Sequence, residues 1–389
     1  MRTAIIGAGF SGLVAAAMLK KSGCEFTLFE ASQRAGKKLL ATGNGRCNIT
    51  NENIDISRYH GNTDFANAVL KRFSSDTLYE FFEGIGLVLK AEEEKVYPHS
   101  FRASEVLDLL RLAEGECELC GKKVTKIIKR KNGLGVIADN KEEIFDNVLV
   151  ATGGKAAPKL SGGGSYELLT SLGHRLTNLS PSIVQLKCDG TRALEGIKVN
   201  AKVRVGSLCD SGEVLFASYG LSGPPVMQLS RNAKGETVSL DLAPDMSFFE
   251  IFEYLKAKSA ISYITVGNLF TGFINKKVGG AILKRVTDKK TTEPAVTLSD
   301  KELKALSAAV KNFDFLIKDT MGFDNAQVTA GGIDLSDFDP ETMESKLVKG
   351  LYAAGEVTDV DGDCGGFNLQ WAFSSAYLAA LSIIGKCEL

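Results

Sequence analysis

Apolar and polar positions along this chain follow patterns that change from one region to the next. Near the N-terminus, residues 4–6 form a short apolar run that predicts a buried strand. A glycine-rich turn follows, and residues 13–20 continue with small and apolar residues typical of a helix packed on a sheet. A second apolar run at residues 26–29 predicts another strand, which ends at Glu30. This order predicts the start of an α/β fold.

The next region predicts a loop, helices and then strands. Residues 36–51 contain several glycines and indicate a loop, whereas apolar spacing indicates helices around residues 64–84 and 103–113. Residues 124–131 and 134–138 flank Asn132-Gly133, a pair typical of a tight hairpin. The run 147–152 is apolar and ends in Gly153-Gly154, so we expect a buried strand that returns to the first sheet.

The second half of the chain leaves this pattern and later resumes it. Short alternating segments between residues 183 and 242, such as residues 198–205, indicate an antiparallel sheet or small barrel. Helical patterning then extends from residue 248 to about residue 309, and residues 314–318 predict one more strand. In the last part, residues 351–354 predict a strand and residues 368–384 a long helix.

Composition restricts the class of protein. The chain has 389 residues, 44% of them hydrophobic, and we expect no apolar run long enough to span a membrane. A net charge of −1 with interspersed signs argues against nucleic acid and membrane partners. Eight scattered cysteines and an N-terminal apolar stretch interrupted by glycines, unlike a secretory signal, indicate reduced thiols and a cytoplasmic location.

The glycine-rich turn between the first strand and helix has the spacing of a dinucleotide-binding fingerprint. Gly7 permits a tight turn, Gly9 lets a phosphate approach the backbone, and Gly12 lets the helix pack closely on the strand. The helix N-terminus favours the negative pyrophosphate. Glu30, at the end of the second strand, can accept hydrogen bonds from both ribose hydroxyls and disfavours the 2′-phosphate of NADP. The alternative is a strand-to-helix turn without a ligand.

Metal centres are not expected. Cys117 and Cys120 have the spacing of a redox or metal motif, but a predicted strand would place them on opposite faces. His60, His99 and His174 are too dispersed for a metal site. Residues 359–363 resemble the opening of a calcium loop, yet Cys364 and Gln370 occupy positions that require glycine and glutamate.

Several segments resemble the YhiN/BaiN-like flavoproteins, often called the aminoacetone oxidase family, and the likeness covers essentially the whole chain. The segments are residues 42–51, 329–332, 342–346 and 350–371. The resemblance implies a Rossmann-like FAD-binding domain of the two-dinucleotide-binding-domain type, with an inserted β-barrel-like domain and a helical insertion. We therefore expect a noncontiguous FAD domain at residues 1–182 and 326–389, a barrel-like substrate domain at 183–245 and 312–325, and a helical insertion at 246–311.

FAD is the expected cofactor, because the fingerprint and the C-terminal glycine clusters pair as two halves of one flavin site. By resemblance, Glu356 contacts the flavin ribitol, and the segment starting at Gly365 lies beside the isoalloxazine, where a helix N-terminus can stabilise negative charge. The alternative for Gly365-Gly366 is a flexible helix cap. The expected cofactor-binding residues are Gly7, Gly9, Phe10, Ser11, Gly12, Glu30, Ala31, Lys38, Gly43, Asn44, Gly45, Arg46, Cys47, Thr152, Gly153, Gly154, Gly355, Glu356, Gly365, Gly366, Phe367, Asn368 and Leu369.

Catalytic residues are less defined. Arg46 could hold an anionic group or brace its loop, and Cys47 is interpreted as a small packed side chain because no partner cysteine or activating base accompanies it. Relatives commonly show Phe-Thr-His before Gly-Leu-Ser-Gly-Pro, whereas this chain has Ser218-Tyr219 at that place. Tyr219 or Ser218 could supply the polar contact of the missing histidine, or Tyr219 could pack in the barrel.

Three functions follow from this interpretation. The preferred one is a FAD-dependent oxidase of a small primary amine such as aminoacetone, with hydride passing to flavin N5, O2 reoxidising the flavin to give H2O2, and imine hydrolysis. It rests on finding no second complete nucleotide fingerprint for a nicotinamide cofactor. The alternative is an NAD(P)H-dependent reductase of a conjugated ketone. The third function is a nonenzymatic flavoprotein that serves as a binding module, for example for RNA.

Overall fold

The computed structural model describes residues 1–231 and 233–387 and divides into two compact units. The first unit contains Met1–Pro181 and Phe323–Leu389, and the second contains Ser182–Gly322. The chain thus leaves its first unit and returns to it. The sequence predicted a further division of the second unit into a barrel-like domain and a helical domain. This finer division stays a prediction.

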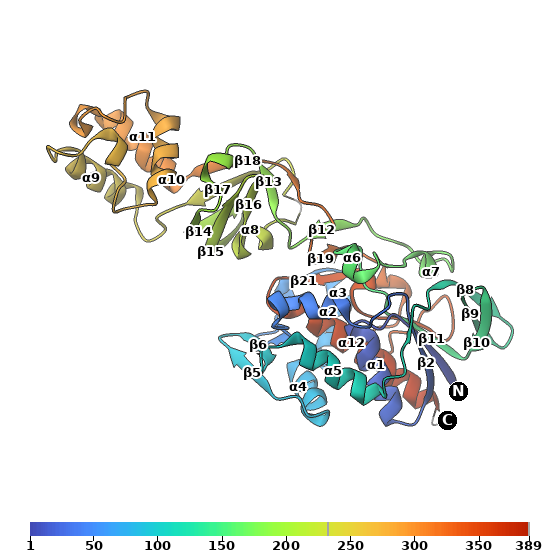
Figure 1. The fold of residues 1–389 in the computed structure, drawn as a ribbon. Coiled ribbons are helices and arrows are strands. Elements are labelled where there is room, and N and C mark those ends of the chain that lie inside the picture. Colours follow the sequence, from blue (N-terminus) through green and yellow to red (C-terminus); the bar gives the residue numbers. More distant parts are fainter. Residues whose placement is uncertain (232, 388–389) are drawn as a thin grey trace. The chain divides into compact units, whose positions relative to one another are not determined.

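The first unit is built on a parallel sheet in the order β20-β11-β1-β2-β7. Figure 1 labels β2 and β11 of this sheet. The residues of β11 and most of those of β1 are buried, as expected for a sheet covered on both faces. Because β11 pairs with β1, the predicted return of the chain to the first sheet is confirmed. The strands of the first unit are β1 (Arg2–Ile6), β2 (Glu25–Glu30), β3 (Thr50–Asn51), β4 (Tyr59–Gly61), β5 (Leu89–Glu92), β6 (Lys95–Pro98), β7 (Leu119–Cys120), β8 (Val124–Arg130), β9 (Gly133–Ala138), β10 (Lys141–Phe145), β11 (Asn147–Val150), β19 (Val328–Ala330), β20 (Leu351–Ala353) and β21 (Val360–Gly362), with β12 (Ser180–Ser182) at its boundary.

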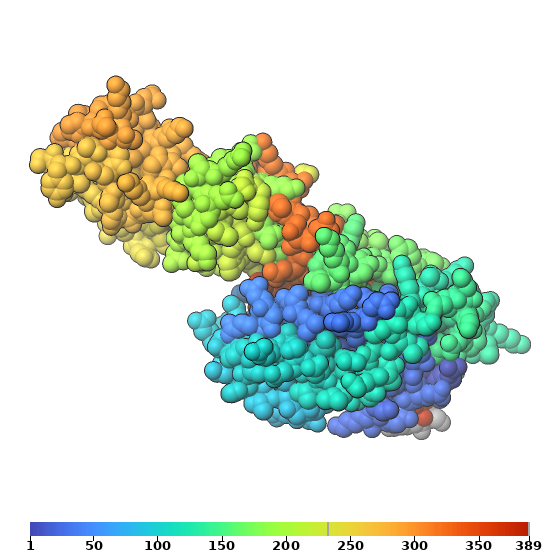
Figure 2. All heavy atoms as spheres, viewed as in Figure 1, coloured from blue at the N-terminus to red at the C-terminus, as the bar shows by residue number. Residues whose placement is uncertain are grey.

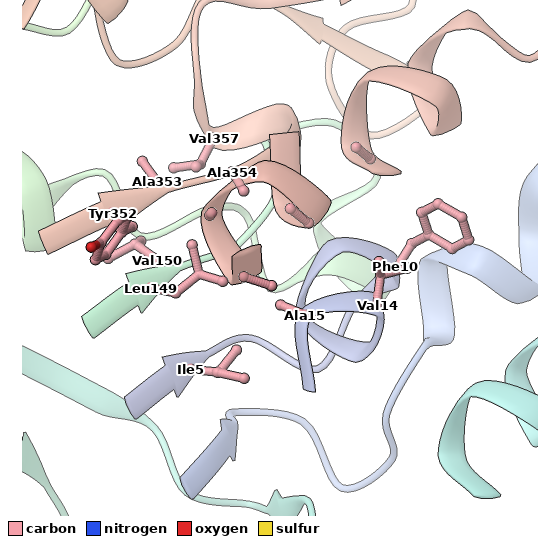
Figure 3. Packing of buried hydrophobic residues seen from close by; sticks show 14 of the residues in the cluster. Ile5, Phe10, Val14, Ala15, Leu149, Val150, Tyr352, Ala353, Ala354 and Val357 are labelled. Atoms are coloured by element: carbon pink, nitrogen blue, oxygen red, sulfur yellow. The ribbon is translucent and has the colours of Figure 1, made fainter. Parts of the chain in front are cut away.

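Helix α1 lies at the centre of the first unit and packs against α5 and α12. Its residues from Phe10 to Leu19 are all buried, because small side chains let the sheet and both helices approach. Figure 3 shows Ile5 of β1, Val14 and Ala15 of α1, and Leu149 of β11 among the buried residues of this core. The helices of the unit are α1 (Phe10–Lys21), α2 (Lys37–Ala41), α3 (Thr63–Arg72), α4 (Ser75–Gly84), α5 (Ala103–Glu114), α6 (Pro158–Ser161), α7 (Glu167–Thr170) and α12 (Phe367–Cys387).

The second unit contains a closed antiparallel barrel in the order β13-β16-β15-β14-β17-β18. The alternation predicted for residues 198–205 appears in β14, whose side chains at Ala201, Val203 and Val205 are buried. Of the two predicted arrangements, the barrel is the correct one. Its strands are β13 (Leu186–Cys188), β14 (Lys198–Val205), β15 (Leu208–Ala217), β16 (Gly220–Ser222), β17 (Thr237–Asp241) and β18 (Phe313–Thr320), and the short helix α8 (Pro224–Gln228) follows β16.

A helical segment lies between β17 and β18 and consists of α9 (Phe248–Ser259), α10 (Lys276–Val286) and α11 (Asp300–Lys311). Ser247 and Ser299 form capping boxes at the starts of α9 and α11. Each serine side chain accepts the backbone N–H of the glutamate three residues later, and that glutamate side chain accepts the serine N–H. In the space-filling view this segment, coloured yellow to orange, forms one lobe of the second unit beside the green barrel strands (Figure 2).

Three expectations from the sequence need correction. Residues 36–51 are not all loop, because α2 forms at Lys37–Ala41. The strand expected to contain both Cys117 and Cys120 begins only at Leu119, and the Cys117 thiol instead donates to Glu114 Oε2 at 2.9 Å. Helix α12 has the length and apolar composition of a membrane-spanning helix, but 67% of this stretch is buried, which explains its composition as that of a core helix.

Candidate FAD site

The glycine-rich turn joins β1 to α1 and shows a different requirement at each glycine. A Cβ on Gly12 would lie 1.8 Å from the Gly7 carbonyl oxygen, and one on Gly7 would lie 2.4 Å from the Ala151 carbonyl oxygen. Gly7 also has φ +106°, a left-handed conformation that favours glycine. A Cβ on Gly9 would meet nothing within 4 Å. Gly7 and Gly12 therefore close the turn, whereas Gly9 borders open space at the start of α1.

The start of α1 is suited to an anion. Gly9 is its N-cap and makes no side-chain capping bond, and the first turn contains no acidic residue. The first N–H groups of a helix have no acceptor within the helix, and the helix dipole makes this end positive. A pyrophosphate beside Gly9 would satisfy these donors.

Glu30 is fixed by backbone groups at the end of β2. Its Oε2 accepts the Ala8 N–H at 2.9 Å and its Oε1 accepts the Ser32 N–H at 2.7 Å. An ionised carboxylate offers about four lone-pair sites, so ribose hydroxyls can still donate to it. The contact with Ala8 connects the glycine-rich turn to the predicted ribose acceptor. Ala31, the next residue, is exposed.

The C-terminal glycine motif meets the start of α1. A Cβ on Gly355, which has φ +75°, would lie 2.3 Å from Ser11 Oγ. The next residue, Glu356, forms an ion pair with Lys38 (Nζ–Oε2 2.5 Å), and its Oε1 accepts the Thr329 N–H at 2.9 Å. The two halves of the predicted flavin site, far apart in sequence, are therefore adjacent. Contact of Glu356 with the ribitol stays a prediction.

The turn after β11 borders the same region. A Cβ on Gly154 would lie 2.6 Å from Glu356 Oε1 and 2.5 Å from Thr329 Oγ1, so a larger residue here would displace these two side chains. Gly153 has φ +69°. Thr152 Oγ1 is buried and has no hydrogen-bond partner among the described residues. A buried hydroxyl without a partner is costly unless a ligand supplies one.

The loop before β3 packs against the start of α12. Gly366 has φ +99°, and a Cβ there would lie 2.2 Å from the Thr50 carbonyl oxygen. Asn51 Nδ2 donates to the Gly365 carbonyl oxygen at 2.9 Å, and Thr50 Oγ1 donates to Gln370 Oε1. Gly365-Gly366 is therefore a fixed connection and not a flexible cap. Thr50 and Asn51 were not predicted as site residues, although they lie in the segment that carries the family resemblance.

The predicted residues that follow Gly366 have structural partners. The Asn368 side chain closes the turn before α12, with Oδ1 accepting the Gly362 N–H at 2.9 Å and Nδ2 donating to the Gly362 carbonyl at 2.7 Å. Phe367 is buried against Tyr59, with ring centroids 5.7 Å apart, and Leu369 packs against the core. Because these side chains are engaged elsewhere, a flavin at this end of the site would contact the backbone at the N-terminus of α12.

Arg46 braces its own loop. Its Nη2 lies 2.6 Å from Glu92 Oε2, and its guanidinium covers the rings of Tyr97 and Phe101 at 4.6 and 4.4 Å from their centroids. Of the two roles left open by the sequence, the contacts support bracing. The loop itself is strained into left-handed conformations at Gly43, Asn44, Gly45 and Cys47.

Cys47 is a packed side chain. It is fully buried, and burial raises the pKa of its thiol to about 12. A thiol with this pKa stays protonated near neutral pH and is a poor nucleophile. The structure thus agrees with the small packed role inferred from the sequence.

Tyr219 belongs to the second unit, at the turn between β15 and β16. Its side chain is 36% exposed, so it does not pack inside the barrel. Ser218 is exposed beside it. Both residues line a surface hollow on the barrel, described below.

The open space at Gly9, the Thr152 hydroxyl without a partner among the described residues and the Gly355–Ser11 contact together fit FAD, and with the parallel sheet they indicate a dinucleotide-binding protein. The chain belongs to the family described as HI0933-like protein Rossmann domain, whose model matches residues 1–382. It is therefore an FAD-dependent oxidoreductase.

The relatives of this family cover the chain from end to end. The chain is 37% identical to a 3-dehydro-bile acid delta(4,6)-reductase of Clostridium scindens over 97% of this chain and 98% of the relative. It is 30% identical to a ribosomal RNA dihydrouridine synthase of Haemophilus influenzae over 97% of each. Among solved structures, the open conformation of a flavocytochrome c3 fumarate reductase has a TM-score of 0.53 at 15% identity, covering 100% of this chain and 78% of that one. The similarity to the fumarate reductase structure shows the fold alone.

Proposed function

We propose that this protein reduces a carbon–carbon double bond conjugated with a carbonyl group. One observation carries the proposal: two full-length relatives have names that describe such a reaction. A delta-4 bond in a 3-dehydro bile acid is conjugated with the C3 carbonyl. Dihydrouridine is uridine saturated at C5–C6, a bond conjugated with the C4 carbonyl. The substrates differ in size and class, but the reacting atoms have the same pattern.

The chain's own residues support this chemistry by binding and orientation. Bound FAD supplies a centre that accepts and donates a hydride. The residues around Gly9, Glu30 and Glu356 would hold the dinucleotide, and the N-terminus of α12 favours negative charge at its end of the site. The reaction also consumes a proton, which must come from a protein group or from water.

The comparisons do not support the sequence-based preference for amine oxidation. The curated relative with 37% identity is a reductase. The preference rested on the lack of a second nucleotide fingerprint, and a nicotinamide cofactor can bind transiently without one. We therefore place the conjugated-ketone reductase first.

Anaerobic mixing of the purified holoprotein distinguishes these activities. We expect NADPH or NADH to bleach the flavin absorbance, and a 3-oxo-delta-4 steroid or a uridine-containing RNA to restore it without O2. Restoration by RNA alone would keep the reaction class and identify the substrate. Bleaching by aminoacetone, with no response to either nicotinamide and recovery only in air, would contradict the proposal and favour the amine oxidase.

A further inference from the structure

A hollow of about 480 Å³ lies on the barrel surface of the second unit, and its lining includes none of the residues assigned to FAD. Strands β13 and β18, the start of the β13–β14 connection and the β15–β16 turn surround it. Its lining is unusually cationic for a chain with net charge −1 and consists of Lys187, Cys188, Asp189, Gly190, Arg192, Ser218, Tyr219 and Lys318.

The barrel ladder fixes the positions of these side chains. Lys187 pairs with Gly220 of β16 and with Asp319 of β18. Its neighbours Leu186 and Cys188 are buried inside the barrel, so the alternation of a strand directs Lys187 outward. The same alternation exposes Lys318 next to the buried Ile317.

Hydrogen bonds hold the two loops of the hollow together. The Cys188 N–H donates to the Tyr219 carbonyl at 3.0 Å. Thr191 Oγ1 donates to the Ala217 carbonyl at 2.8 Å, which connects the loop that carries Arg192 to the residue before Ser218. The hydroxyls of Ser218 and Tyr219 therefore lie on a fixed backbone beside the cations.

The positive charges exceed the carboxylates available to them. Lys318 pairs with Asp189. Asp319 faces Lys187 in the ladder, and its carboxylate forms an ion pair with Lys234 at 3.5 Å. The Thr320 N–H, Lys234 and, more weakly, Lys187 lower the pKa of the Asp319 carboxyl. Lys187 and Arg192 have no carboxylate within ion-pair distance among the described residues.

Arg285 of α10 lies near Gly190 of the hollow but is not itself part of its lining. A Cβ on Gly190 would lie 3.6 Å from Arg285 Nη2. The Arg285 guanidinium stacks on Phe313 and Phe315 at 4.2 and 4.6 Å from their centroids, which holds it in place. Cations held in place by ring contacts and a strand ladder are pre-organised for an anion.

We propose that this hollow binds a phosphate monoester group. Such a group is a dianion with three strong acceptor oxygens, which matches two unpaired cations and two neighbouring hydroxyls. It has two sources. One is the 2′-phosphate of NADPH, which rests on the proposed reductase function, and the other is a phosphorylated organic substrate. Glu30 disfavours a 2′-phosphate at the FAD fingerprint, so an NADPH phosphate needs cations elsewhere.

Equilibrium titration of the oxidised holoprotein tests the proposal without turnover. The test variant is Lys187→Gln/Arg192→Gln. The matched control is Lys276→Gln/Lys277→Gln, which removes the same charge from exposed positions at the start of α10, outside the hollow. The probes are NADP+, NAD+, glycerol 3-phosphate and inorganic phosphate, none of which can reduce the flavin, and each is measured by calorimetry at low and high salt.

We expect the test variant to bind NADP+, glycerol 3-phosphate and inorganic phosphate about tenfold more weakly, and the control to stay within about twofold of wild type. A preference for NADP+ over NAD+ that the test variant loses would identify the nicotinamide source. Tight glycerol 3-phosphate binding without that preference would identify a phosphorylated substrate. Wild-type protein that binds none of the phosphate probes, or equal affinity in the test variant, would overturn the proposal. Since no reaction is measured, absence of enone reduction would not affect this result.

Discussion

The FAD site of the first unit and the hollow of the second unit are built in different ways. The FAD site depends on backbone positions where a side chain cannot fit, such as Gly12 and Gly366. The hollow depends on exposed side chains placed by the barrel ladder, such as Lys187 and Lys318. The first kind of site binds a cofactor common to a whole family, whereas the second can change its ligand by exchanging surface residues. This difference agrees with relatives that are named for different substrates.

The largest effect should come from filling a position that closes the glycine-rich turn. In Gly12→Val, the new Cβ would lie 1.8 Å from a backbone carbonyl oxygen that cannot move without disrupting β1 and α1. We expect a loss of about 3 kcal/mol or more in unfolding free energy, together with loss of FAD. Denaturant unfolding of the purified protein measures it.

A control comes from Gly385 in α12, where a Cβ would meet nothing within 4 Å. Gly385→Val should leave FAD content unchanged, and because valine has a slightly higher helix propensity than glycine, the unfolding free energy should change by less than about 1 kcal/mol. Equal destabilisation by both valines would show that close packing at Gly12 is not the cause.

The next effect separates binding from folding. Gly9 has ordinary backbone angles (φ −81°) and borders open space, so Gly9→Val should leave the apoprotein as stable as the wild-type apoprotein. The same side chain occupies the volume that a pyrophosphate needs. We expect FAD affinity to fall about 100-fold, which corresponds to about 2.8 kcal/mol. Fluorescence titration of apoprotein with FAD gives the affinity, and unchanged affinity would place the pyrophosphate elsewhere.

A smaller loss of FAD should follow from Glu30→Arg. The substitution removes the ribose acceptor and the contacts with the Ala8 and Ser32 N–H groups. We expect FAD affinity to fall about 10- to 30-fold. Glu25→Arg in the same strand is the control, because Glu25 is exposed and pairs only with Arg2 at the surface. A Glu30→Arg protein that retains full FAD occupancy in equilibrium dialysis would contradict the assignment of Glu30 as the ribose acceptor.

The smallest effect should come from Cys47→Ser. The thiol is buried and protonated, so FAD affinity and turnover should change by less than about twofold. Loss of turnover in a folded, FAD-loaded variant would show that the thiol reacts.

The same variant has a signature in the pH dependence of stability. Folding raises the Cys47 pKa from 9.0 to about 12, so above pH 9 the unfolded chain loses a proton that the folded chain keeps. The wild-type protein should therefore lose stability as pH rises from 9 toward 12, by up to about 1.4 kcal/mol per pH unit from this group. Cys47→Ser should make the curve shallower over that range. An unchanged slope would mean that the thiol is not buried in the folded protein.

Sequence patterns predicted most of the first unit because its constraints act locally. The strand, glycine turn and helix at residues 2–21 each have a recognisable residue pattern. Glu30 follows them at the spacing that is typical of the motif. Apart from the return of β11 to the first sheet, contacts between distant segments were accessible only through family resemblance. Neither the Gly355–Ser11 approach nor the Lys38–Glu356 pair has a local pattern that would indicate its partner.

The hollow could not be predicted from the sequence. Lys187, Arg192 and Lys318 look like ordinary solvated charges in their own segments, since exposed strand positions are often occupied by lysine. Only closure of the barrel brings β13, β16 and β18 together. The one signal was the change from histidine to Ser218-Tyr219, which indicated that this turn differs from relatives.

The proposed reaction class is tested most directly by the oxidative half-reaction alone. Holoprotein reduced photochemically under nitrogen is mixed with a 3-oxo-delta-4 steroid or with the corresponding saturated ketone, and the return of the flavin absorbance is followed. We predict that the conjugated ketone reoxidises the flavin and is recovered saturated at C4–C5, while the saturated ketone leaves the flavin reduced. Because relatives act on different substrates, a uridine-containing RNA is tested in parallel. Reduced flavin that persists with both conjugated compounds yet recovers at once in air would contradict the proposed function.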